Sequence, residues 1–173
     1  RGGGGGGGDP LRVGAVGGLG AVGPAGVARP CDGGRGGVVR GEGAACVVLG
    51  GTRGPSTVRV AGFGRGLDVH HLTDPDPDGQ VAEATMRAAL DGRSVQYVQA
   101  HGTATPKGDA SEALALHRIF GGAVPIGSVK GALGHWIAGA GALGLLCAIE
   151  AVSSGGTASP ARPFPTVGLP PPD

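Results

Sequence analysis

The chain contains 173 residues, 40 of them glycine and 14 proline, and it carries a formal net charge of +1. Glycine plus proline reaches about 31%, a level typical of low-complexity segments, but the 40% hydrophobic and 16% charged content argue against a disordered chain. The even balance of 14 basic and 13 acidic residues excludes a strong electrostatic attraction to nucleic acid or to an anionic membrane.

The chain shows no feature of a membrane or secreted protein. No apolar run approaches the roughly 20 residues that cross a bilayer, and Arg1 followed by seven glycines is unlike a signal peptide. Three cysteines, an odd number without metal-ligand spacing, favour a reduced, cytoplasmic setting and no metal site. The absence of an initiator methionine indicates a fragment of a longer protein.

In chain order, the apolar patterning predicts an alternation of strands and helices after a loosely structured, Gly-rich lead. Short β-branched runs bounded by glycine predict strands, and longer runs rich in helix formers predict helices. Residues 73–79, TDPDPDG, predict a loop, because alternating prolines remove hydrogen-bond donors. One helix is expected to begin with Asp109 as its N-cap and Glu112 at the capping-box position. The predicted elements are strands at 44–49, 58–63, 95–100 and 124–129, and helices at 80–90, 109–120 and 137–152.

This order, β-β-α-β-α-β-α, predicts a layered α/β sheet with right-handed crossovers. Helix 137–152 consists of small and apolar residues, so we expect it to lie buried between layers. The length of the chain fits a single domain with a core of its own.

Two histidines follow predicted strands. His101 comes directly after strand 95–100, and His135 follows strand 124–129 with Lys130 in the same connection. Ligands of α/β sheets bind at the carboxyl ends of strands, so these three residues are the candidate site. A purely structural role stays the alternative for each histidine taken alone.

Other titratable groups are weaker candidates. We expect His70 and His71 to lie at the surface. His117 lies in the middle of a predicted helix, where either packing or solvent exposure is expected. The acidic residues of loop 73–79 alternate with prolines, which does not match the glycine and spaced ligands of a calcium loop.

The three cysteines do not predict a nucleophile. Cys46 and Cys147 lie within apolar elements and predict inert, buried thiols. Cys31 lies beside Asp32, whose negative charge is expected to raise the thiol pKa.

Four segments resemble, in order, motifs of the β-ketoacyl synthase family, the condensing enzymes of fatty-acid and polyketide synthesis. Residues 29–43, RPCDGGRGGVVRGEG, resemble RPFDxxRDGFVxGEG, and residues 73–79 resemble TxPDPDG. Residues 101–112, HGTATPKGDASE, resemble HGTxTxxGDxxE, and residues 128–141, SVKGALGHWIAGAG, resemble SxKxxxGHxxGAAG. The chain is thus similar to the C-terminal half of a discrete, type II β-ketoacyl-[acyl-carrier-protein] synthase.

The resemblance implies a thiolase-like fold, present here as an incomplete C-terminal half of a layered αβαβα architecture. Residues 1–28 would be a Gly-rich remnant of the N-terminal half or a linker, and residues 29–173 a truncated C-terminal domain. The implied reaction is the decarboxylative Claisen condensation of malonyl-acyl carrier protein with an acyl thioester. The implied catalytic residues are His101 and His135, with Lys130 orienting them; Thr103, Thr105 and Thr73 would bind substrate, and Asp109, Glu112 and Gly134 would support the site.

The resemblance also implies acyl carrier protein as a partner, whose phosphopantetheine arm carries the substrates, and no resident cofactor. It implies a homodimer or a heterodimer with a related synthase. The family's active-site cysteine would lie upstream of Arg1, so we expect this chain alone to be inactive. Cys31, Gly36 and Val38 depart from the family motif, which has Phe, Asp and Phe there.

Two alternative functions remain open for such a chain. A chain-length-factor-like partner or degraded copy of the same family would be inactive, but a scaffold has no need of both histidines and Lys130. A thiolase would use a cysteine base in a Gly-rich loop of its C-terminal half, and none of the three cysteines has that setting.

Overall fold

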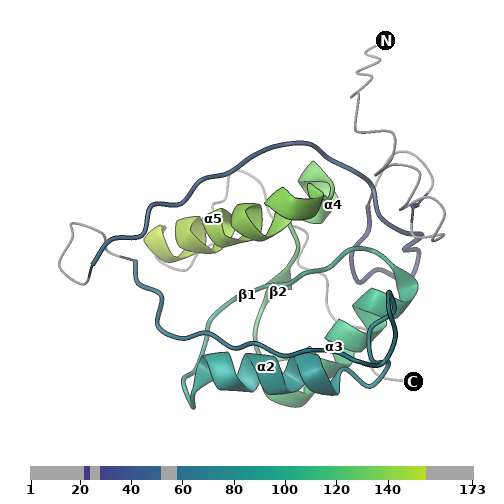
Figure 1. Cartoon of the computed structure of the whole chain (residues 1–173), viewed down its shortest axis with the longest axis horizontal. Helices are drawn as coiled ribbons and strands as arrows, with labels where there is room; N and C mark the ends of the chain where they lie inside the picture. The colour runs from purple at the N-terminus through teal and green to yellow at the C-terminus, as the bar shows by residue number, and fades with distance from the viewer. Residues whose placement is uncertain (1–21, 24–27, 52–57, 155–173) are drawn as a thin grey trace, which may run out of the picture.

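The structure is a computed structural model that describes residues 22–23, 28–51 and 58–154, so the Gly-rich lead lies almost wholly outside the described residues. Figure 1 shows three layers, with α2 and α3 on one side of the β1–β2 pair and α4 and α5 on the other. The elements are α2 (Gln80–Leu90), β1 (Val98–Gln99), α3 (Pro106–Phe120), β2 (Ile126–Gly127), α4 (Lys130–Leu133), the 3-10 turn η1 (Ile137–Gly139) and α5 (Ala140–Ser153).

The two strands form a parallel pair, with Val98 opposite Ile126 and Gln99 opposite Gly127. Because α3 connects them, β1, α3 and β2 form a β-α-β unit, which confirms the predicted α/β class. Both strands are shorter than the predicted runs 95–100 and 124–129, since only two residues of each are paired. Parallel pairing directs both carboxyl ends to the same edge, where the candidate residues follow.

A small apolar core joins the strand pair to the helices below it. Ala100, Leu116 and Ile126 are buried together, and Met86 and Phe120 pack against them. Leu116 is completely buried on α3. This packing anchors the segment between β1 and α3, which carries His101.

The helix ends follow the local sequence. Helix α2 has the predicted bounds, 80–90, with Gly79 and Asp91 in the left-handed conformation on either side. Helix α3 begins at Pro106, three residues before the predicted start, because proline lacks an N–H and is accommodated in the first turn of a helix. Asp109 is therefore not the N-cap, and its carboxylate has other partners, described below.

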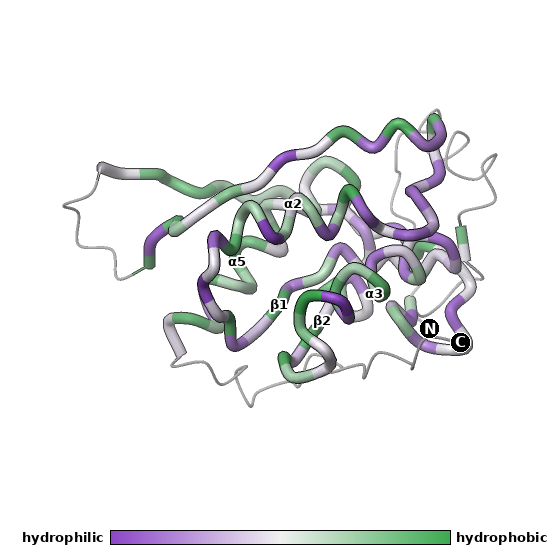
Figure 2. Tube along the Cα trace, turned by 90° about the horizontal axis from the view of Figure 1, so that it is seen from below, coloured by the Kyte–Doolittle hydropathy of each residue, from purple (hydrophilic) through white to green (hydrophobic). Residues whose placement is uncertain are grey.

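The predicted strands 44–49 and 58–63 are not observed. Neither segment is part of a strand or a β-bridge among the described residues. The second segment instead lies on α2 through alternate glycines: a Cβ on Gly62, Gly64 or Gly66 would come under 3.0 Å from backbone or side-chain atoms of that helix. The extended chain along the upper margin of Figure 2 alternates between hydrophobic and hydrophilic residues.

Helix 137–152 begins as η1 and continues as α5, and it is less buried than predicted. Only Ala140 and Leu143 of α5 are buried, whereas Leu145 and Leu146 are exposed. Among the described helices and strands, α5 packs against β1 and against the adjoining turn η1. None of the described helices is long and apolar enough to span a membrane.

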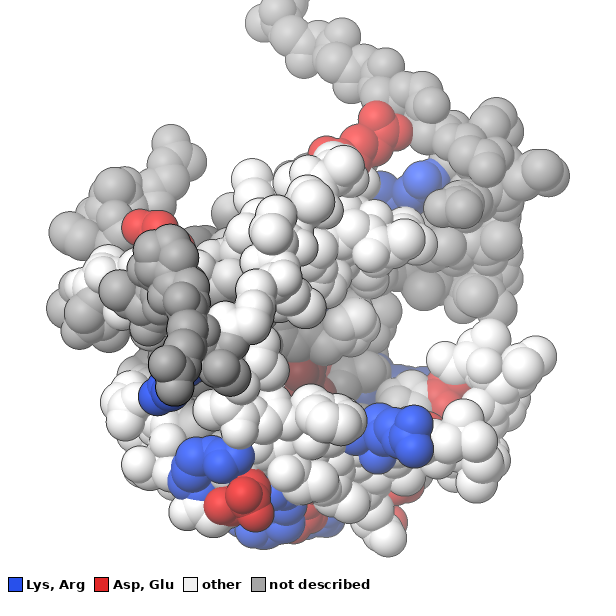
Figure 3. Space-filling model, turned by 60° about the vertical axis from the view of Figure 1, so that its left-hand side comes forward, with Lys and Arg blue, Asp and Glu red and all other residues white. Residues whose placement is uncertain are grey.

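Charged side chains of both signs are interspersed on the face drawn in Figure 3. On α2 and α3, Arg87 pairs with Glu83 at 2.8 Å, and Arg118 approaches the same carboxylate at 3.5 Å. This mixed pattern agrees with the near-zero net charge.

Candidate active site

The structure brings His101 and His135 together at the carboxyl ends of β1 and β2. Their ring centroids lie 5.6 Å apart with an interplanar angle of 87°. Residues 34 positions apart in sequence meet because the β-α-β unit returns the chain to the same edge of the strand pair.

Two carboxylates of α3 hold the loop that carries His101. Glu112 accepts hydrogen bonds from the backbone N–H groups of His101 at 2.7 Å and Gly102 at 2.8 Å. Asp109 accepts from Thr103 at 2.9 Å and Ala104 at 3.0 Å. Neither carboxylate caps the helix in the way the sequence predicted, because α3 begins upstream of both. They bind the backbone of the histidine loop instead.

Lys130 lies beneath the histidine pair and is only 4% exposed. Its ammonium donates a hydrogen bond to the carbonyl oxygen of His101. Burial lowers the pKa of Lys130, and the negative charges of Glu112 and Asp109 act in the opposite direction. The residue is therefore a buried positive charge that holds the backbone of His101 and lowers the pKa values of nearby groups.

His135 is held in one ring orientation. Its Nδ1 accepts a hydrogen bond from the backbone N–H of Ile137 at 2.9 Å, so the neutral ring carries its proton on Nε2. Burial lowers the pKa of His135 to about 4, and the charges of Lys130 and His101 add to this effect. At pH 7 the imidazole is neutral and Nε2–H is its free donor.

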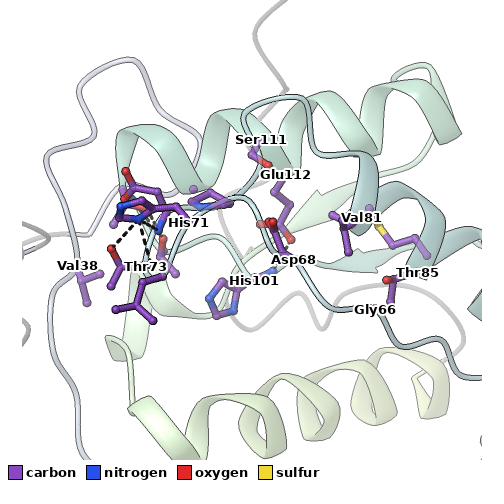
Figure 4. A pocket seen from close by; sticks show the side chains of 18 of the residues that line it. Val38, Gly66, Asp68, His71, Thr73, Val81, Thr85, His101, Ser111 and Glu112 are labelled. Atoms are coloured by element: carbon purple, nitrogen blue, oxygen red, sulfur yellow. Dashed lines mark hydrogen bonds between the residues drawn. The ribbon is translucent and has the colours of Figure 1, made fainter.

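His101 is affected in the same direction. Burial is the largest cause of its lowered pKa and the charge of Lys130 is the second, while Glu112 and Asp109 oppose them. The ring nevertheless opens onto the pocket in Figure 4. Both rings are thus favoured in the neutral form near pH 7.

A pocket of about 960 Å³ lies over the two rings. Thr73, Thr103 and Thr105 line it together with the histidines, and residues of α2 such as Thr85 and Met86 close its far side. The hydroxyl oxygens of Thr103 and Thr105 are 2.8 Å apart. The volume and the few polar groups are typical of a small-molecule site.

The rim of the pocket includes a residue that the sequence analysis placed at the surface. His71 is exposed, but it also lines the pocket, and its Nδ1 accepts hydrogen bonds from the N–H groups of Thr73 at 3.2 Å and Asp74 at 3.3 Å. The feature of the sequence that could have indicated this position is that His71 lies next to the proline-rich loop 73–79. His70 lies at the surface, as predicted, and His117 is exposed, which is one of the two settings expected for it.

Gly134 allows a close backbone approach beside His135. Its φ is 72°, and an added Cβ would lie under 3.0 Å from backbone atoms of Arg40 and Gly41. Gly134 therefore supports the site by letting residues 39–41 run against the His135 loop.

The three cysteines each differ from prediction. Cys31 is buried, and burial is the main cause that raises its pKa to about 12, with the charge of Asp109 second; the expected contribution of Asp32 is not among the causes. Cys46 is exposed rather than buried. Cys147 is partly buried rather than fully buried, and this burial raises its pKa. The described residues contain no cluster of His, Cys, Asp and Glu that could hold a metal ion.

Comparisons with known proteins agree with this geometry. The family model described as "Beta-ketoacyl synthase, C-terminal domain" matches residues 57–161. Over 143 residues the chain is 36% identical to the 3-oxoacyl-[acyl-carrier-protein] synthase 2 of Coxiella burnetii, covering 75% of this chain and 34% of that relative. The chain thus spans about a third of the length of the curated relatives it matches.

Solved structures resemble the fold. A β-ketoacyl synthase from Burkholderia phymatum matches with a TM-score of 0.70 and 28% identity, covering 84% of this chain and 38% of that one. A type II polyketide ketosynthase in the complex AntDE:AntF, with its acyl carrier protein, matches with a TM-score of 0.72 and 23% identity, covering 95% and 44%. The fold is therefore that of the thiolase-like condensing enzymes. With the family model matching well over half of its length, the chain belongs to the β-ketoacyl synthase family and corresponds to the C-terminal domain.

Proposed function

We propose that the chain acts as the histidine-bearing part of a β-ketoacyl-[acyl-carrier-protein] synthase, which catalyses a decarboxylative Claisen condensation. The observation that supports this function is the pair of neutral imidazoles, 5.6 Å apart at the floor of the pocket. Two neutral N–H donors suit a reaction in which negative charge develops on a carbonyl oxygen.

In the proposed reaction, the malonyl thioester binds with its thioester oxygen between the two rings. The bond between the carboxylate carbon and C2 breaks, carbon dioxide leaves, and the electron pair becomes the enolate whose oxygen receives the N–H donors of His101 and His135. The C2 carbon then attacks the acyl group, which the family carries as a cysteine thioester, and the thiolate departs. Neutral rings matter because an imidazolium would protonate and quench the enolate instead of only stabilising it.

The buried charge of Lys130 supports this assignment. Its ammonium bonds the carbonyl oxygen of His101 rather than either ring, so it leaves both imidazoles free toward the pocket. Its charge also lowers the pKa of both histidines, which keeps them neutral. We therefore assign Lys130 to orienting and tuning the pair.

The substrate arm is assigned to the polar side of the pocket. The hydroxyl groups of Thr103, Thr105 and Thr73 line that side and can hydrogen-bond the amides of a phosphopantetheine arm. Acyl carrier protein is the proposed partner, as in the AntDE:AntF complex. We also propose a cytoplasmic synthase that pairs with a second copy or with a related synthase.

The test is His135→Ala in the complete synthase, with carbon dioxide release from malonyl-acyl carrier protein as the measurement. We expect the rate to fall about 10²-fold or more, because one of the oxyanion donors is lost. Acylation of the enzyme's cysteine by an acyl thioester should stay within about twofold, since the donors are needed chiefly for the enolate. His117→Ala, on the exposed face of α3, is the matched control.

Two outcomes would contradict the proposal. An unchanged rate of carbon dioxide release would remove His135 from the reaction and favour the non-catalytic, chain-length-factor-like partner. A loss of cysteine acylation as large as the loss of decarboxylation would assign His135 to a different step.

A further inference from the structure

The turn that fixes the ring of His135 is strained. Ile137 has a φ of 54°, in the left-handed region, which is an outlier for a β-branched residue. In the same turn the N–H of Ile137 donates to Nδ1 of His135, two residues earlier, and the direction of this N–H is set by Trp136, whose φ is −81° and ψ is 13°. Such a conformation persists only where the surroundings hold it in place. The residue between the two, Trp136, contacts residues on either side of this turn.

The indole of Trp136 is anchored at both ends. Its Nε1–H donates to the carbonyl oxygen of Leu133 at 3.1 Å. The opposite, six-membered ring lies against Gly43, where an added Cβ would come under 3.0 Å from three ring carbons. An added Cβ on Gly41 would lie 2.8 Å from Cδ1 and 2.9 Å from Nε1 of the indole. The ring therefore occupies the space that side chains at residues 41 and 43 would otherwise fill.

The segment that the indole covers is also paired with the backbone of His135. The N–H of His135 donates to the carbonyl oxygen of Val39 at 2.8 Å, and the N–H of Gly41 donates to the carbonyl oxygen of His135 at 3.1 Å. Figure 1 shows this part of the chain running over α4 and the start of α5. The same ring thus holds the turn on one side of His135 and the pairing on the other.

We propose that Trp136 is a positioning residue for His135. Its indole packs against Gly41 and Gly43 and thereby keeps the N–H of Ile137 on Nδ1 of His135, which keeps the ring proton on Nε2. Trp136 is not among the residues that line the pocket over the two histidine rings. The structural part of this inference, that Trp136 fixes the ring of His135, is independent of the proposed function. The effect on catalysis rests on the proposed function.

The main experiment compares Trp136→Ala with the unchanged protein by NMR, using the ¹⁵N shifts of the His135 ring and amide hydrogen exchange. We expect the ring to lose its single Nε2–H tautomer, and exchange at Gly41 and His135 to rise roughly tenfold or more as the pairing opens. Phe120→Ala, which loosens the core of α3, should lower stability without changing the His135 ring shifts. Unchanged shifts and exchange in Trp136→Ala would overturn the inference.

A second variant tests the same contact from the glycine side. It keeps the inference testable if the Trp136→Ala protein does not fold. Gly43→Ala places a methyl group against the indole, and Gly50→Ala, with nothing within 4 Å, is its matched control. We expect the changed His135 ring shifts and the faster exchange at Gly41 and His135 in Gly43→Ala only. If both variants show these changes, or if neither does, the packing of Trp136 on Gly43 does not position His135.

The catalytic consequence is measured in the complete synthase. Trp136→Ala should lower kcat for malonyl decarboxylation about tenfold or more, with KM changed much less, because a misplaced donor affects the transition state. Adding Ile137→Gly should restore part of the loss, since glycine adopts a φ of 54° without strain. If the ring is released but decarboxylation is unchanged, the positioning role stands and the proposed function of His135 fails.

Discussion

At the scale of single residues, Asp109 shows how one buried side chain organises the site. It is 2% exposed, and its two oxygens accept three backbone N–H groups. Two of these groups belong to the loop after His101, and the third is the N–H of Cys31, 78 residues earlier in the chain, at 2.6 Å. The carboxylate thus ties an early segment to the histidine loop.

Asp109→Asn should destabilise the chain by about 2–3 kcal/mol, because the amide NH₂ would face buried N–H donors and leave them unsatisfied. Urea denaturation of both proteins measures the change. Asp91→Asn, at an exposed pair with Arg93 of 3.4 Å, is the control and should change little. Equal midpoints for Asp109→Asn and the unchanged protein would contradict the assigned role.

His135 predicts a dependence of stability on pH. Its pKa is about 4 in the folded chain against an ordinary value of 6.5, so the unfolded chain binds the proton first as pH falls. The contribution of His135 to the free energy of unfolding is therefore fully present above about pH 6.5 and is lost as the pH falls toward 4. Solvent screening of the partly exposed ring makes the loss smaller than the full linkage value.

The measurement is the urea midpoint at pH 7.5 and at pH 5, for the chain and for His135→Asn. Asparagine keeps an acceptor near the position of Nδ1 but does not titrate, so its midpoint should fall less between the two pH values. A fall of the same size in both proteins would show that His135 does not contribute.

At the scale of elements, glycines decide how an extended segment packs on a helix. Gly62, Gly64 and Gly66 all face α2, which lets the backbone of the segment approach that helix closely. Periodicity predicted α2 correctly, because helix formers and the flanking turn residues are all local. The segment beside it was wrongly predicted as a strand, because β-branched runs indicate an extended chain and cannot supply its partner.

Gly64→Ala should therefore destabilise the chain by about 1–3 kcal/mol, since the new methyl group would overlap the carbonyl of Thr85. Gly51→Ala, which has nothing within 4 Å, is the matched control. Thermal unfolding monitored by circular dichroism checks the difference. If both variants unfold at one temperature, the segment does not depend on this close packing.

At the scale of the whole molecule, the described residues leave apolar side chains uncovered. Leu72 is 95% exposed and Val48 is 91% exposed. Other exposed hydrophobic residues of the same two segments are Leu49, Val60, Phe63, Leu67 and Val69. A concentration of this kind marks an interaction surface or a tendency to associate.

We expect the chain by itself to bind a hydrophobic dye such as ANS at pH 7 without denaturant. Replacing Val60, Leu67 and Val69 together by Ser should lower the fluorescence, because these side chains supply the apolar surface. Replacing the exposed Ala138 by Ser is the control. Absence of dye binding by the unchanged chain would mean that the surface is covered in solution.

The sequence by itself determined the α/β class, helix 80–90, and the placement of His101, His135 and Lys130 after strands, because periodicity, turn residues and motif spacing are local properties. Only the tertiary structure decided which groups the carboxylates of Asp109 and Glu112 bind, and that Trp136 covers Gly43. It also decided that His135 keeps its proton on Nε2, since that depends on a strained turn. These outcomes depend on contacts between residues far apart in the chain, which form only when the strands and helices pack together.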